Sequence, residues 1–133
     1  MDNLNKFKFF IVDDDIFYAN LYNDYLKNYD NVYFYNNGHD CIDCLNQKPD
    51  IVFVDYNMED MTGIEALREI KEYNPNIMVI VLFSPQESAK IADESMNFGT
   101  YQCMLKDKNI CSKMALFIDS VKESKEQFSK FFN

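Results

Sequence analysis

The chain has 133 residues, which favours a single domain. Hydrophobic residues make up 47% of it, enough for a core, and only 3 Gly and 3 Pro argue against a disordered or linker-rich chain. The net charge of −9 argues against direct binding to nucleic acid or to an anionic membrane surface, because both need a basic face.

The sequence also gives no sign of a membrane span or a secretion signal. The longest apolar stretch, 77–83, is too short to cross a bilayer. The first six residues lack a basic segment followed by an apolar one. We therefore expect a cytoplasmic protein whose four cysteines are reduced thiols.

Five short apolar runs predict strands, and helical patterns fill the gaps between them. The strands are expected at 7–12, 31–35, 50–54, 77–82 and 101–105. Three of these runs are nearly continuous, as in strands buried on both faces of a sheet, whereas the second is weaker and suits a sheet edge.

The helical patterns cover about 16–27, 38–46, 62–73, the segment after Pro85 to 98, and 110–121. In the first of them, Phe17, Leu21 and Tyr25 lie on one side and are expected to face the core. The third opens with a capping-box pattern, Thr62 to Glu65.

Strict alternation of strand and helix in so short a chain predicts an α/β fold. We expect one doubly wound, five-stranded parallel sheet in the flavodoxin-like order 2-1-3-4-5, with helices on both faces. The whole chain, 1–133, is expected to form one domain. About 123–133 would extend the last helix and carry Phe128, Phe131 and Phe132.

Acidic residues follow two of the predicted strands. Asp13 and Asp14 come after the first strand, and Asp55 comes after the third. In the predicted order these strands are neighbours, and open α/β sheets bind ligands at the carboxyl edge. Clustered carboxylates repel one another unless a hard cation lies between them, and Mg²⁺ prefers such oxygens. The sequence therefore predicts a metal-assisted phosphate site, where Ser84 and Lys106 would end the fourth and fifth strands.

Taken together, these segments resemble the receiver domain of two-component response regulators, above all the stand-alone chemotaxis-type receivers. The resemblance covers essentially the whole chain. The matching segments are Ile11-Val12-Asp13-Asp14-Asp15, Val54-Asp55-Tyr56-Asn57-Met58, Met61-Thr62-Gly63, Ser84 and Leu105-Lys106.

The resemblance implies a role for each matching residue. Asp55 would accept a phosphoryl group from the phosphohistidine of a histidine kinase or phosphotransfer protein. The metal ligands for Mg²⁺ would be Asp13, Asp14, Asp55 and the backbone carbonyl of Asn57. Ser84 and Lys106 would each contact a phosphoryl oxygen. Such a chain is not an enzyme acting on other molecules, since it catalyses only its own phosphorylation and dephosphorylation.

The implied protein is a signalling switch that acts through a partner surface. Its output would go to an unknown effector protein or to a second copy, through the face formed by the fourth and fifth helices and the last strand. No direct contact with nucleic acid or membrane is expected. Two alternatives are a haloacid-dehalogenase-like phosphatase and a degenerate receiver that binds partners without phosphorylation.

Four positions depart from the pattern usual in these receivers. Glu59 and Asp107 stand where proline is common, and Pro85 stands where a small residue is typical. Cys103 takes the place of the aromatic ring that usually moves on activation, which puts that aromatic switch in doubt. The nearby pattern Cys41-x-x-Cys44 lies within a predicted helix, so we interpret it as packing cysteines.

Overall fold

The computed structural model describes residues 7–98 and 102–132, with side chains at all of these except 95–98 and 128–132. Five parallel strands form one sheet in the order β2-β1-β3-β4-β5, so the predicted fold and strand order are confirmed. The strands are β1 (Phe9–Val12), β2 (Val32–Tyr35), β3 (Ile51–Asp55), β4 (Met78–Phe83) and β5 (Gln102–Leu105). The weak second strand lies at an edge, as expected.

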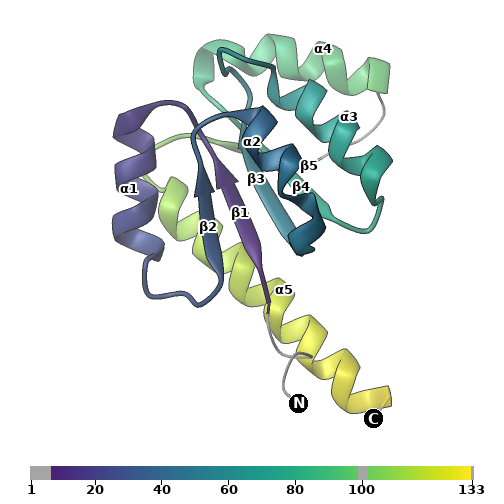
Figure 1. Ribbon diagram of the computed structural model, residues 1–133. Helices are drawn as coiled ribbons and strands as arrows, with labels where there is room; N and C mark the ends of the chain where they lie inside the picture. Colours follow the sequence, from purple (N-terminus) through teal and green to yellow (C-terminus); the bar gives the residue numbers. More distant parts are fainter. Residues whose placement is uncertain (1–6, 99–101, 133) are drawn as a thin grey trace.

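Helices cover both faces of the sheet (Figure 1). They are α1 (Ile16–Leu26), α2 (Gly38–Asp43), α3 (Gly63–Tyr73), α4 (Ser88–Phe98) and α5 (Ile110–Phe132). Short 3-10 turns, Leu45–Gln47 and Pro85–Glu87, follow α2 and precede α4. The second helix is therefore shorter than predicted, because its last turn tightens into a 3-10 turn.

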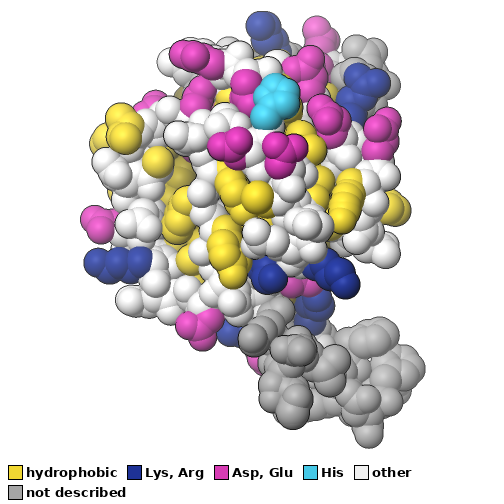
Figure 2. Space-filling view, in the orientation of Figure 1, with side chains coloured by type: hydrophobic (Ala, Val, Ile, Leu, Met, Phe, Trp, Pro, Cys, Tyr) yellow, Lys and Arg dark blue, Asp and Glu magenta, His cyan; other side chains and the backbone are white. Residues whose placement is uncertain are grey.

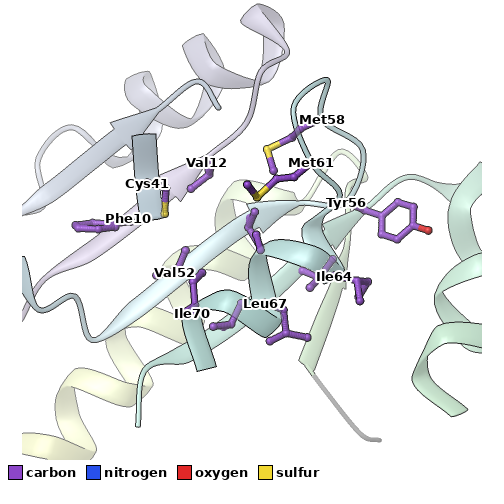
Figure 3. Packing of buried hydrophobic residues seen from close by; sticks show 14 of the residues in the cluster. Phe10, Val12, Cys41, Val52, Tyr56, Met58, Met61, Ile64, Leu67 and Ile70 are labelled. Carbon is purple, nitrogen blue, oxygen red and sulfur yellow. The ribbon is translucent and has the colours of Figure 1, made fainter. Parts of the chain in front are cut away.

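Alternate residues of each central strand point to opposite faces and build two cores. Phe10, Val12, Val52 and Val54 face α2, α3 and α4 in one core, part of which Figure 3 shows. Their neighbours in sequence face α1 and α5 in the other: Phe9, Ile11, Ile51 and Phe53. β1 and β3 are buried on both faces and pair with each other in parallel, so their carboxyl ends lie side by side.

The first helix packs through a different face from the one predicted. Phe17 and Tyr25 are 66% and 53% exposed, and Leu21 is 38% exposed, whereas Tyr22 and Leu26 are completely buried. The expectation that Phe17, Leu21 and Tyr25 form core was therefore wrong. The helix carries a second apolar stripe, shifted by one residue, that contains Tyr22 and Leu26. This second stripe faces the sheet.

Side chains cap the starts of α1 and α3, and the cap of α3 is the predicted capping box. Asp15 caps α1 by accepting the backbone N–H of Phe17 at 2.9 Å. Thr62 and Glu65 form the capping box of α3. No helix in the part of the chain that the structure describes is long and apolar enough to cross a membrane.

Candidate phosphoacceptor site

The carboxyl ends of β1 and β3 bring three carboxylates together. Asp13, Asp14 and Asp55 each offer an oxygen, and these oxygens all lie within 4.8 Å of one another. Asp13 and Asp55 are buried, whereas Asp14 is exposed at the rim. Three hard oxygen donors at this spacing, two of them shielded from water, form a set that suits a small divalent cation such as Mg²⁺.

Lys106, which follows β5, neutralises part of this negative charge. Its Nζ donates to Asp55 Oδ1 at 2.6 Å and to Asp13 Oδ2 at 3.0 Å. The lysine side chain is only 7% exposed, so the three groups form a buried ionic cluster. The backbone N–H of Lys106 donates to Phe83 O at 2.7 Å, which fixes where the side chain leaves the sheet.

Asp13 and Asp14 also accept hydrogen bonds from other groups. The backbone N–H of Asp15 donates to Asp13 Oδ1 at 2.9 Å, and the Tyr22 hydroxyl donates to Asp13 Oδ2 at 3.3 Å. At the rim, the backbone N–H of Glu59 donates to Asp14 Oδ2 at 2.8 Å. A proline at position 59 would lack that N–H, so this bond depends on one of the departures from the usual receiver pattern.

The electrostatics of the cluster leave Asp55 poorly stabilised as an anion. Burial raises the pKa of Asp55 to about 7, and the charge of Asp13 adds to the effect while Lys106 opposes it. Burial likewise raises the pKa of Asp13 despite its contacts with Lys106. Burial disfavours the charged form of Lys106 too, but the Asp55 hydrogen bond and the two aspartate charges outweigh it and raise the lysine pKa.

A close backbone approach places the start of α3 against the end of β3. The N–H of Gly63 donates to Tyr56 O at 2.8 Å. A Cβ atom at Gly63 would lie 2.7 Å from the Asp55 carbonyl oxygen and 2.9 Å from Tyr56 Cα, which only glycine avoids without a backbone shift. The pairing of Asn57 with Thr62 also holds the loop between β3 and α3. A metal contact from the Asn57 carbonyl stays a prediction.

Ser84 lies at the same edge, at the end of β4. The chain turns there into the 3-10 segment, and the backbone N–H of Ser84 donates to the Glu87 carboxylate at 2.8 Å. The structure therefore brings Asp13, Asp14, Asp55 and Lys106 into one cluster and has Ser84 at the same edge of the sheet, at the end of β4. A hydroxyl contact from Ser84 to a phosphoryl group stays a prediction.

Sequence reasoning missed several residues around the site. Tyr22 and the ring of Tyr18, which lies over Lys106 Nζ, come from α1 and were not expected there. Tyr56 points away from the other labelled core residues in Figure 3, and its hydroxyl donates to Glu94 of α4 at 2.6 Å. The tyrosine directly after Asp55 could have been noted in the sequence, but its partner on α4 could not.

Known proteins resemble the chain in sequence as well as in fold. The family model of the response regulator receiver domain matches residues 9–114. The transcriptional regulatory protein ZraR of Klebsiella oxytoca is 33% identical over 98 residues, which are 72% of this chain and 22% of that protein. A protein-glutamate methylesterase/protein-glutamine glutaminase of Clostridium acetobutylicum is 28% identical over 135 residues, 98% of this chain and 39% of that protein. The chain thus spans well under half the length of these relatives.

Solved structures show the same fold. The receiver domain of AraT from Geobacillus stearothermophilus aligns with a TM-score of 0.72 at 24% identity, covering 92% of this chain and 98% of that one. The chemotaxis protein CheY4 of Vibrio cholerae aligns with a TM-score of 0.72 at 20% identity, covering 86% and 98%. The acidic cluster at the ends of β1 and β3 agrees with the family match over residues 9–114. These findings identify the chain as a member of the response regulator receiver domain family of two-component systems.

Proposed function

We propose that the chain is a phosphorylation-dependent switch that accepts a phosphoryl group on Asp55. The observation that carries the proposal is the buried contact of Asp55 with Lys106, beside the two carboxylates of Asp13 and Asp14. Phosphoryl transfer depends mainly on positioning and on neutralising charge, and this cluster supplies both.

In the proposed reaction, a carboxylate oxygen of Asp55 forms the new bond to phosphorus. The bond between phosphorus and the imidazole nitrogen of a histidine kinase or phosphotransfer protein breaks, and that nitrogen keeps the electron pair. Lys106 Nζ then turns from the carboxylate to a phosphoryl oxygen, and the Ser84 hydroxyl donates to another. The chain acts on itself alone in this reaction.

Mg²⁺ is the proposed cation at this site, held by Asp13, Asp14, Asp55 and the backbone carbonyl of Asn57. The proposal is supported by the three carboxylates, whose oxygens lie within 4.8 Å of one another. When bound, Mg²⁺ would supply positive charge at the site of phosphoryl transfer. The metal charge would also lower the pKa of Asp55, because an opposite charge favours the carboxylate. Asp14 keeps one carboxylate oxygen beyond its bond to Glu59 N–H, so it can serve as a ligand at the rim.

Output is proposed to pass through α4, β5 and α5, to an effector protein or a second copy. The bond from Tyr56 to Glu94 ties the residue after the phosphoacceptor to α4. Cys103 is exposed on β5, so this bond offers a route to α4 that needs no ring at position 103. We also propose that the domain spans 1–133 with the end of α5 as an extension; the side chains of Phe128, Phe131 and Phe132 lie outside the described residues.

The test is to incubate the chain with acetyl phosphate and Mg²⁺ and to map the product by mass spectrometry. We expect one acyl phosphate per chain, at Asp55, and none in the Asp55→Asn variant, whose fold circular dichroism should show to be intact. Size-exclusion chromatography of the same sample reports self-association. Full phosphoryl incorporation in Asp55→Asn would show that Asp55 is not the acceptor.

A further inference from the structure

An aromatic ring of α1 lies against the charged end of Lys106. The Nζ atom is 4.0 Å from the centroid of the Tyr18 ring, well within the range of a cation–π contact. The same Nζ bonds to Asp55 and Asp13 and is largely shielded from water. Because the attraction between a cation and a ring strengthens when water is excluded, this contact is placed where it has the greatest effect.

Tyr22, one turn further along α1, fixes the helix in this orientation. Its side chain is completely buried, and its hydroxyl donates to the Asp13 oxygen that Lys106 also contacts. The rings of Tyr18 and Tyr22 lie 5.9 Å apart on the same side of the helix, as residues four apart do. On the buried face of α1, Tyr22 therefore contacts the Asp13 carboxylate and Tyr18 contacts the Lys106 ammonium.

We propose that Tyr18 is a positioning residue that holds the Lys106 ammonium at the phosphoacceptor. The inference rests on the proposed function of Asp55. An ammonium has three N–H groups, of which Asp55 and Asp13 take two. A ring face attracts the charge without fixing the direction of the N–H groups. Lys106 can therefore turn from carboxylate to phosphoryl oxygen while the ring keeps it at the site.

The first experiment compares substitutions at Tyr18 by the rate of phosphorylation at saturating Mg²⁺ and acetyl phosphate. Tyr18→Leu removes the ring and should slow phosphorylation roughly five- to thirtyfold, the factor expected for a lost cation–π contact. Tyr18→Phe keeps the ring and should restore the rate. Tyr25→Leu makes the same substitution on the exposed side of α1 and serves as the control.

A second experiment separates positioning from packing. Each Tyr18 variant is combined with Lys106→Met, and the rates are analysed as a double-mutant cycle. If the ring acts through the lysine, Tyr18→Leu slows phosphorylation no further when Lys106 is absent. Fluorinated phenylalanines at position 18 weaken the ring charge at nearly constant size, so the rate should fall stepwise with each fluorine.

An activity-independent readout keeps this inference distinct from the proposed function. In the unphosphorylated chain, the ring should shift the NMR signals of the Lys106 Cε protons upfield, and Tyr18→Leu should abolish that shift. A wild-type chain that takes up no phosphoryl group would overturn the proposed function, while the NMR shift would still report the contact. A phosphorylated wild type with equal rates in Tyr18→Leu, or equal losses with and without Lys106, overturns the role of Tyr18.

Discussion

At the scale of single residues, the burial of each carboxylate and its hydrogen-bond and ion-pair partners set the direction of its pKa shift and its structural role. Asp55 and Asp13 share Lys106 as an ion-pair partner, and burial raises the pKa of both carboxyl groups. Asp60, only five residues after Asp55, accepts the backbone N–H groups of Gly38 and His39 and contacts the His39 ring at 2.7 Å. In Figure 2 the histidine lies among acidic side chains on the surface. Asp60 therefore ties the loop of the site to the start of α2, where a negative charge is favourable.

This arrangement predicts a pH-dependent contribution of Asp60 to stability. Partial burial alone would raise the pKa of Asp60, but the N–H bonds from His39 and Gly38 and the His39 ring outweigh it and lower the pKa below 3.8. A carboxylate with a lowered folded-state pKa stabilises the fold above the unfolded-state value and loses that effect as the pH falls through the folded-state pKa.

Asp60→Asn should therefore cost about 0.5–1 kcal/mol in free energy of unfolding at neutral pH, after allowance for solvent screening. Urea denaturation of both proteins from pH 7 to pH 3 measures the difference, which should shrink below about pH 4. Asp24→Asn, at an exposed carboxylate near the end of α1, is the control. A difference that stays constant with pH would show that the Asp60 charge is unimportant.

At the scale of elements, α1 shows how a helix can carry two apolar stripes and bury one. Tyr18, Tyr22 and Leu26 recur every four residues, and so do Phe17, Leu21 and Tyr25. Both stripes have the spacing of a core-facing helix surface. Contact with the sheet and α5 selects the stripe that contains Tyr22 and Leu26.

Neighbouring alanine substitutions test this assignment. Leu26→Ala should lower the free energy of unfolding by about 2–5 kcal/mol, because it leaves a cavity in a fully packed site. Tyr25→Ala, one residue earlier and half exposed, should cost less than about 1 kcal/mol. Chemical denaturation measures both, and equal costs would show that the helix is rotated relative to the structure.

At the scale of the whole molecule, the chain combines a net charge of −9 with a buried acidic cluster. Like charges brought together on folding destabilise the folded state, and one lysine compensates only part of them. A divalent cation that binds the folded chain alone should stabilise the entire fold by mass action.

The expected result is a rise in melting temperature with Mg²⁺ concentration in the wild-type chain. Asp14→Asn should abolish the rise, because it removes a charged ligand at the rim. The same variant should melt slightly higher than wild type without metal, since it relieves repulsion within the cluster. Differential scanning fluorimetry measures both effects, with Asp24→Asn as the charge-matched control. An undiminished response to Mg²⁺ in Asp14→Asn would place the metal elsewhere.

The amino-acid sequence was sufficient to predict the fold and most residues of the acidic cluster. Apolar runs alternating with helical patterns specify a parallel sheet, and the residues at the strand ends must then meet at one edge. This is why Asp13, Asp14, Asp55 and Lys106 could be predicted to lie together before any distance was known. The capping box of Thr62 and Glu65 joins residues only three apart, so it could be predicted from the sequence in the same way.

The side of α1 that faces the sheet could be learned only from the folded structure. The buried side depends on the rotation of the helix about its axis. Because both apolar stripes have the same spacing, the sequence does not show which of them is buried. The same rotation places Tyr18 over Lys106 and Tyr22 against Asp13. Contacts between groups far apart in the chain, such as Tyr56 with Glu94, likewise arise from packing, because no local pattern encodes the partner of an isolated polar side chain.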